Sequence, residues 1–271
     1  MRIIHRFGFC ISEQQQKQLE ALGVKSPSAI NLPGDHPFVA FDVAENHPNW
    51  PQIYELLQHW DSADSTIRTE FSKKEIRAAH WLELGAWHNG YPQPDEDNFG
   101  YQEATYDLSD FCEQCGIGTK QKAPFQLKNE PKWGKRGIFQ LIWVYDEFFV
   151  TPDVWAHVFE PHGIGCRHVI NTKGIELKTV VQLVVDEEIS IATEGLHHER
   201  CDRCGRLKYI PVTRGMFPAL TSRPSQAMVK TTDYFGSGGQ ADKRVLISQD
   251  LALSLADKKV RGALLKPAAE L

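Results

Sequence analysis

The stretch CDRCGRLKY, residues 201–209, places two cysteines two residues apart and follows them with a glycine. The stretch FCEQCGIGTK, residues 111–120, repeats the same C-x-x-C-G pattern. A single C-x-x-C is a weak signal, because it is compatible with a redox pair, half of a metal site or chance. Two copies with matching glycines favour one metal site that takes its ligands from both stretches.

Zinc is the metal that this pattern predicts. Structural zinc takes four ligands in a tetrahedron, and thiolates reach it at about 2.3 Å. Two thiolates separated by two residues can bind one ion if the backbone turns tightly, and a following glycine tolerates the positive φ of that turn. We therefore expect one structural Zn²⁺ with four ligands: Cys112, Cys115, Cys201 and Cys204. Four thiolates leave no open coordination position, so this ion is not expected to be catalytic.

The two knuckles are far apart in the sequence, with 85 residues (116–200) between them. Closing a loop of this length costs roughly 4 kcal/mol. Structural zinc binding contributes about 10–16 kcal/mol in small peptides. Zinc binding therefore outweighs loop closure, and the intervening segment is expected to be a folded insert.

Two other uses of the thiols are less favoured. A thioredoxin-like redox pair starts a helix after a strand and occurs once, whereas neither copy here precedes a convincing helical pattern. Disulfides belong to oxidising compartments. The N-terminus, MRIIHRFGFCISEQQQ, lacks the apolar core of a signal peptide, so a cytoplasmic protein is expected.

Histidines close to the second knuckle offer alternative ligands. His197 and His198 are expected to be exposed turn residues instead. Together with Glu199 they imitate the H-x-E of zinc deaminases, but that signature has its cysteine pair in a separate segment. Here Cys201 follows Glu199 by two residues, so a deaminase is not expected.

Composition is that of a globular protein, with 41% hydrophobic and 24% charged residues in 271. No apolar run is long enough for a transmembrane helix. The formal net charge of −5 is unevenly spread: residues 41–110 contain 14 acidic and 4 basic residues, and residues 112–140 contain 6 basic and 2 acidic ones. Either these are two solvated faces, or an acidic surface recruits a basic partner.

Local patterns indicate a mixture of strands and helices. Ser12 and Gln15 form a capping box after a strand over 2–9, and Ser72 with Glu75 announces a helix that runs on to Trp87. The other expected elements are strands at 38–43, 138–145, 166–170, 177–185 and 245–247, helices from 51, 152 and 249, and a closing edge strand before Pro267. The fold class predicted is α+β.

Three further segments invite functional interpretation. FGSGGQAD (235–242) precedes a strand, whereas phosphate loops follow one, so a flexible connection or tight turn is favoured. The loop 89–110 is expected to be ordered by its tyrosines.

The segment 120–136 interleaves lysines with aromatics, as some nucleic-acid-binding ribbons do, and its patch would comprise Lys120, Lys122, Lys132 and Arg136. Asp146 and Glu147 follow a strand, but no nucleophile motif accompanies them.

Both knuckles, CEQCG and CDRCG, together with YDEFFV, EPHGIGCR and TTDYFGSGGQADKRVLIS, resemble the bacterial double-CXXCG motif proteins over roughly residues 100–271. The closing VLISQDLALSLADKKVRGALLKP is similar to immunity proteins of bacterial polymorphic toxin systems. The resemblance implies a zinc-ribbon fold with the four cysteines as ligands, and it implies no activity.

The expected architecture is a split zinc ribbon with four cysteine ligands, which joins an N-terminal α/β region to a C-terminal sheet-containing region. Its parts are an acidic region (1–110), the zinc-ribbon region with its insert (111–215) and a strand–helix–strand region (216–271). The expected function is that of a non-enzymatic cytoplasmic zinc-binding protein that binds another protein, in particular a basic toxin. A nucleic-acid-binding zinc ribbon is the alternative. An enzyme would be marked by a deep pocket with perturbed titratable groups.

Overall fold

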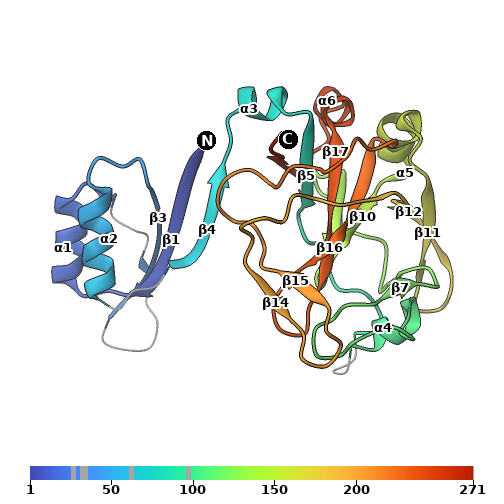
Figure 1. The fold of residues 1–271 in the computed structure, drawn as a ribbon, viewed down its shortest axis with the longest axis horizontal. Coiled ribbons are helices and arrows are strands. Elements are labelled where there is room, and N and C mark those ends of the chain that lie inside the picture. The colour runs from blue at the N-terminus through green and yellow to red at the C-terminus, as the bar shows by residue number, and fades with distance from the viewer. Residues whose placement is uncertain (26–28, 31–35, 61–63, 96–98, 271) are drawn as a thin grey trace. The chain divides into compact units, whose positions relative to one another are not determined.

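The computed structural model describes the chain except residues 26–28, 31–35, 61–63, 96–98 and 271, and the chain divides into two compact units (Figure 1). Unit 1 comprises Met1–Glu75 and Val212–Met216, and unit 2 comprises Ile76–Pro211 and Phe217–Leu271. Each unit has a hydrophobic core of its own. The strand pairs of the sheets are mostly antiparallel, and helices pack against them, which makes the protein α+β, as the sequence predicts.

Unit 1 is a four-stranded antiparallel sheet, of order β2–β3–β1–β4, with two helices against it. Its elements are β1 (Arg2–Cys10), α1 (Glu13–Ala21), β2 (Ala29–Ile30), β3 (Phe38–Ala44), α2 (Trp50–His59) and β4 (Asp64–Glu70). The predicted capping box forms at α1, where Ser12 and Gln15 bond reciprocally. Ile53 and Leu57 of α2 pack on Phe7 of β1, because the apolar stripe of the helix meets the inward face of the sheet.

Residues 212–216 return to unit 1 from a distant part of the sequence. The Thr69 hydroxyl donates to the carbonyl of Thr213 at 3.0 Å and accepts the amide of Gly215 at 2.8 Å. Arg214 forms an ion pair with Glu45 at 2.6 Å. These polar contacts bind the segment to strand β4 and to the end of strand β3.

Unit 2 contains a seven-stranded sheet and a five-stranded sheet. The first has the order β14–β15–β16–β17–β5–β18, with β13 beside β16, and the second has the order β8–β11–β12–β10–β9. The strands of the first are β5 (Trp81–Ala86), β13 (Glu188–Ile189), β14 (His198–Arg200), β15 (Leu207–Tyr209), β16 (Met228–Phe235), β17 (Asp242–Ser248) and β18 (Ala263–Pro267). Those of the second are β8 (Gln126–Leu127), β9 (Ile138–Leu141), β10 (Val144–Val150), β11 (Cys166–Asn171) and β12 (Glu176–Leu183).

The remaining elements of unit 2 are short. They are β6 (Tyr106–Asp107), which pairs with β7 (Lys120–Gln121), α4 (Gly100–Thr105), α5 (Pro152–Val154), a π turn (Trp155–Phe159), a 3₁₀ turn (Glu160–His162) and α6 (Gln249–Asp257). Helix α3 (Lys73–Ala78) spans the boundary between the units in the sequence. None of the helices in the described part of the chain is long and apolar enough to cross a membrane.

The two sheets of unit 2 share a core, and strands β10 and β17 lie side by side there (Figure 1). Phe148 and Val150 of β10 face this shared core, whereas Phe149 faces a second core on the other side of its sheet. In that second core Phe149 stacks on Phe139 at 5.3 Å between ring centroids. The alternation of side chains along β10 therefore gives the five-stranded sheet a buried surface on both faces.

Two predicted elements are wrong in extent. The helix announced by Ser72 ends at Ala78, and residues 81–86 form strand β5 between β17 and β18. Its buried residues, Leu82, Leu84 and Ala86, alternate with period two, which is the strand signal. The run 138–145 is not one strand, since the chain turns at 142–143 and forms the hairpin β9–β10. The turn contains no glycine, proline or asparagine, so the sequence does not mark it.

Candidate metal centre

The four cysteines of the two knuckles converge on one point in unit 2. The Sγ atoms of Cys112 and Cys201 lie 3.8 Å apart, those of Cys115 and Cys204 lie 3.6 Å apart, and all four lie within 4.8 Å of one another. Four thiolates at about 2.3 Å from a tetrahedral zinc ion are about 3.8 Å from each other. The donor set therefore fits a tetrahedral ion, and the cluster can hold a metal.

Each knuckle is built by the same pair of backbone hydrogen bonds. In the first, the amide of Cys112 donates to the carbonyl of Ile117 at 2.9 Å, and the amide of Gly116 donates to the carbonyl of Cys112 at 2.7 Å. In the second knuckle, the amide of Cys201 donates to the carbonyl of Arg206 at 3.0 Å, and the amide of Gly205 donates to the carbonyl of Cys201 at 2.8 Å. Gly116 and Gly205 have φ of +79° and +72°, as the glycine after each pair predicts.

Short antiparallel strands position both turns. The first knuckle lies between β6 and β7, and the second lies between β14 and β15 at the edge of the seven-stranded sheet. His197 and His198 are exposed, and within the described ranges no histidine or carboxylate joins the group of four thiols. The two remaining cysteines, Cys10 and Cys166, lie outside it.

One basic group, the Arg206 guanidinium, contacts a thiol of the cluster. The Arg206 guanidinium donates to the Sγ of Cys204 at 3.4 Å and, with the Arg206 backbone amide, lowers the pKa of that thiol to about 6. Burial raises the pKa of the Cys115 thiol to about 12. Four thiolates around one divalent ion would leave two uncancelled negative charges, so a guanidinium in contact with a thiolate would stabilise a metal-loaded site.

A buried lysine joins the second knuckle to the first. Lys208 is 3% exposed, and its Nζ donates to the carbonyls of Cys115 and Gln240 at 3.1 Å each and to that of Gly238. All three donors of the ammonium are therefore used, and all three acceptors are backbone carbonyls. Lys208 lies on β15, directly after the second knuckle, and so fixes that strand to the first knuckle and to the loop 236–240.

The glycine-rich loop 236–240 connects β16 to β17 and packs against the first knuckle. A Cβ atom on Gly116 would lie 2.4 Å from the carbonyl oxygen of Gly239 and 2.8 Å from the amide of Ala241. Gly116 is therefore required twice, for its positive φ and for this close approach. The sequence did not indicate that the loop and the knuckle meet; the repeated glycines of the loop were the only available signal.

A cavity of about 710 Å³ adjoins the knuckles. Its lining includes four carboxylates, which are Glu103, Glu113, Asp146 and Asp242. Its aromatic lining residues are Phe99, Tyr101, Tyr106, Phe111 and Trp143. Burial, aided by the Asp146 charge, raises the pKa of Asp242 to about 7, although its carboxylate accepts the amide of Tyr145 at 3.3 Å.

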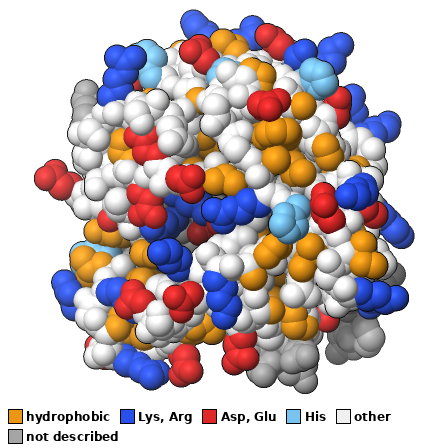
Figure 2. Space-filling model, turned by 90° about the vertical axis from the view of Figure 1, so that its right-hand side faces the viewer, with side chains coloured by type: hydrophobic (Ala, Val, Ile, Leu, Met, Phe, Trp, Pro, Cys, Tyr) orange, Lys and Arg blue, Asp and Glu red, His pale blue; other side chains and the backbone are white. Residues whose placement is uncertain are grey.

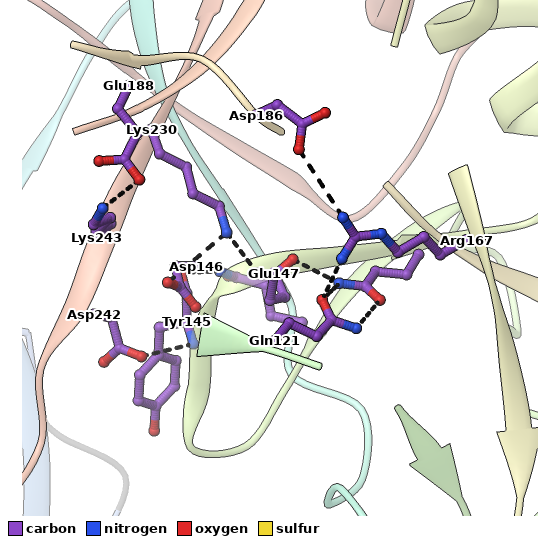
Figure 3. Close-up of polar contacts among 12 residues, drawn as sticks. Gln121, Tyr145, Asp146, Glu147, Arg167, Asp186, Glu188, Lys230, Asp242 and Lys243 are labelled. Atoms are coloured by element: carbon purple, nitrogen blue, oxygen red, sulfur yellow. Dashed lines mark hydrogen bonds and ion pairs between the residues drawn. The ribbon is translucent and has the colours of Figure 1, made fainter. Parts of the chain in front are cut away.

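Asp146 and Glu147 border a second, polar cavity of about 240 Å³ (Figure 3). Glu147 is buried, accepts a hydrogen bond from Gln182 at 2.8 Å and pairs with the Lys230 ammonium. Burial opposes the charge of Lys230, but Glu147 and Asp146 outweigh it and raise the lysine pKa. Sequence reasoning missed this pair, because Lys230 lies 83 residues from Glu147.

The basic segment 120–136 uses its aromatic residues internally. Phe125 is fully buried, and Trp133 packs on Phe139 at 4.9 Å and donates to a backbone carbonyl. Arg136 lies over the ring of Trp87 at 3.8 Å. These rings are not free to stack on bases. On the face shown in Figure 2, Lys and Arg side chains are interspersed with Asp and Glu.

The acidic residues of unit 1 are largely paired as well. Asp42 pairs with Arg6 at 3.2 Å and with Arg68 at 3.0 Å, and Glu70 pairs with Arg68 and Arg2. Exposed pairs of this kind stabilise little, but they cancel local charge. Among the carboxylates that line the 710 Å³ cavity of unit 2, Glu113 pairs with Arg203 at 3.2 Å and Asp146 lies 3.9 Å from the Lys230 ammonium.

No protein-family model matches the chain, and a search of curated proteins gives no match. The fold and the site define an α+β protein with a tetracysteine cluster of metal-binding geometry. Its function is inferred from its own residues.

Replacing Lys208 with methionine removes three donors and leaves backbone carbonyls unpaired near the cluster. We expect the free energy of unfolding to fall by about 3 kcal/mol, since an unpaired buried polar group costs about 1–3 kcal/mol. Urea unfolding measures it. Lys178→Met, on an exposed side chain of strand β12, is the matched control. Equal stability of the two variants would show that the Lys208 contacts contribute nothing.

Asp242 makes stability depend on pH. Its pKa is about 7 in the folded chain and 3.8 in the unfolded one, so the folded state binds the proton more tightly. The free energy of unfolding should therefore decrease as pH rises from about 4 to about 7, by up to about 4 kcal/mol. Asp242→Asn should lessen this decrease and be more stable than the parent at pH 8. An unchanged pH profile of Asp242→Asn, measured by urea unfolding beside Asp257→Asn at an exposed position of helix α6, would contradict this prediction.

Proposed function

We propose that the four clustered cysteines bind one zinc ion, that the ion is structural, and that the protein acts by binding another protein. The observation that carries the metal assignment is the spacing of the four Sγ atoms, which matches a tetrahedral tetrathiolate site. Tetrahedral all-sulfur sites take zinc or iron. Zinc is the redox-inert member of this pair and suits a site with no open position.

The ion would act on the fold rather than on a substrate. It would join the turn between β6 and β7 to the turn between β14 and β15 and so constrain two segments far apart in the sequence. Glu113 and Gly116 from the first knuckle and Arg203 from the second line the 710 Å³ cavity. Zinc binding would therefore hold together part of the wall of that cavity.

Binding of a protein partner is supported by the surface around the cavity. Exposed aromatic rings gather there, and exposed aromatic clusters mark interaction sites more often than isolated apolar side chains do. The carboxylates of the cavity favour a basic partner. Together with the resemblance to double-CXXCG and immunity proteins, this supports a non-enzymatic cytoplasmic zinc-ribbon protein that neutralises a basic toxin.

Cys201→Ser tests the metal assignment. We expect this variant to lose its zinc and to be less stable by about 5 kcal/mol or more, because structural zinc contributes about 10–16 kcal/mol in peptides. Elemental analysis and thermal unfolding measure the two effects. Cys166→Ser, which changes a cysteine outside the cluster, is the control and should keep both. A Cys201→Ser variant with full metal content would sink the four-cysteine assignment.

Protection of cells tests the proposed role. Proteins encoded beside the gene for this chain are expressed in a bacterial host with and without it. We expect one of them to be basic, to stop growth alone, and to form a stable complex with this chain that restores growth. Absence of a toxic neighbour, or toxicity that co-expression does not relieve, would contradict the immunity role.

A further inference from the structure

The cavity of about 710 Å³ lies among helix α4, the first knuckle, the β9–β10 turn and the loop 236–240, all within unit 2. We propose that this cavity receives an arginine or lysine side chain of a basic partner polypeptide, between its aromatic rim and the Asp146 carboxylate. The proposal rests on the protein-binding function proposed above and names the site and chemistry of that binding.

Charge is the first ground for a cationic guest. Four carboxylates and one guanidinium line the cavity. The guanidinium, Arg203, pairs with Glu113 at 3.2 Å on the exposed side of the knuckles. Of the other three carboxylates, Glu103 has no cation in the lining, Asp146 lies 3.9 Å from the Lys230 ammonium of the neighbouring cavity, and Asp242 is only partly ionised at neutral pH because its pKa is about 7. The lining therefore keeps a net negative charge. Low-dielectric walls strengthen the field of such groups, so a cavity of this kind attracts and retains a cation.

Asp146 is the carboxylate best placed to anchor the guest. It is 23% exposed and lies between Lys230 and Asp242 in Figure 3. The Lys230 ammonium bonds to the neighbouring Glu147, and its distance to Asp146 is 3.9 Å, beyond hydrogen-bond length. Asp146 therefore has acceptor capacity that Lys230 leaves unused. A bidentate guanidinium is the donor that uses a carboxylate most fully.

The aromatic rim is the second ground. Tyr91, Phe99 and Trp143 are 45%, 43% and 38% exposed, and Trp143 lies 5.0 Å, between ring centroids, from each of the other two. Cations bind favourably over the faces of such rings, and most favourably over tryptophan. The rim continues outside the cavity, since Tyr91 is not part of its lining. The polypeptide that carries the bound side chain would therefore also contact the aromatic rim.

The backbone holds two of these rings in an uncommon conformation. Trp143 and Phe99 have φ of +72° and +58°, where bulky side chains are rarely found. Trp143 occupies the second position of the two-residue β9–β10 turn, where glycine would be unstrained. The turn keeps a large ring beside the cavity instead. The positive φ of Trp143 is therefore a further ground for a functional site, beside the charge and the exposed rings.

The test uses the full-length chain and two peptides, acetyl-tetraarginine amide and acetyl-tetracitrulline amide, which share shape but differ in charge. Binding is followed by the indole N–H resonances of the seven tryptophans in ¹⁵N-labelled protein. We expect the arginine peptide to shift the Trp143 resonance, which the Trp143→Gly variant identifies. We expect the citrulline peptide to shift it little.

Two variants locate the binding. Asp146→Asn should weaken arginine-peptide binding about tenfold, the loss expected for one charge-assisted hydrogen bond. Asp153→Asn, which removes an equal charge from an exposed helical position, should leave the affinity unchanged. Trp143→Gly loses the ring contacts of Trp143 but relieves its positive φ, so the variant should stay folded, which its melting curve checks, and it should lose most of its affinity.

Several results would overturn the proposal. They are an equal response to citrulline, arginine binding that leaves the Trp143 resonance unmoved, or equal affinities of Asp146→Asn and Asp153→Asn. Zinc content and complex formation with the partner are measured on the same samples. A partner complex that survives Asp146→Asn unweakened overturns this site and leaves the proposed function standing. If the chain binds the arginine peptide at this site but holds no metal and forms no complex with a partner, the proposed function is wrong. The cation site then stands.

Discussion

The convergence of four thiols from two distant turns is the constraint on which unit 2 depends. Tetrahedral geometry demands that the turns meet within about 4 Å, sulfur to sulfur. Lys208 binds one turn to the other and to the loop 236–240, and Gly116 lets that loop approach as no other residue would. Arg206 adds positive charge beside the sulfurs. The four thiols, the buried ammonium of Lys208 and the glycine-rich loop therefore form one connected structure.

This structure connects the proposed metal centre to the proposed binding site. The knuckles form one wall of the cavity, and the loop 236–240 forms another. Asp146 lies at the boundary of this cavity and of the polar one that contains the Glu147–Lys230 pair. Because the Lys230 ammonium is hydrogen-bonded to Glu147 and lies 3.9 Å from Asp146, the Asp146 oxygens keep hydrogen-bonding capacity for the proposed guest. A structural ion at the proposed metal centre would thus support recognition at the proposed binding site without contacting the partner.

Features encoded in a few neighbouring residues were predictable from the sequence. The cysteine knuckles, the capping box at Ser12 and the edge strand before Pro267 all follow from local patterns, and all form. Strand β5 was missed because a helix signal at Ser72 precedes it and its alternation is only six residues long. The turn at Trp143 was missed because a tryptophan occupies the position of positive φ, where a glycine would have indicated a turn. Lys208, Lys230 and the cavity were beyond sequence reasoning, since each joins residues that only the tertiary fold brings together.

Elemental analysis of the purified native chain, with a count of reactive thiols before and after chelation, tests the tetracysteine centre most directly. One zinc per chain is expected, with Cys10 and Cys166 as the only candidates for reaction before chelation and four further thiols after it. Removal of the ion should also lower the melting temperature. A native chain without zinc, whose cysteine pairs instead oxidise to disulfides, would contradict a structural metal centre and restore the redox interpretation of both C-x-x-C pairs.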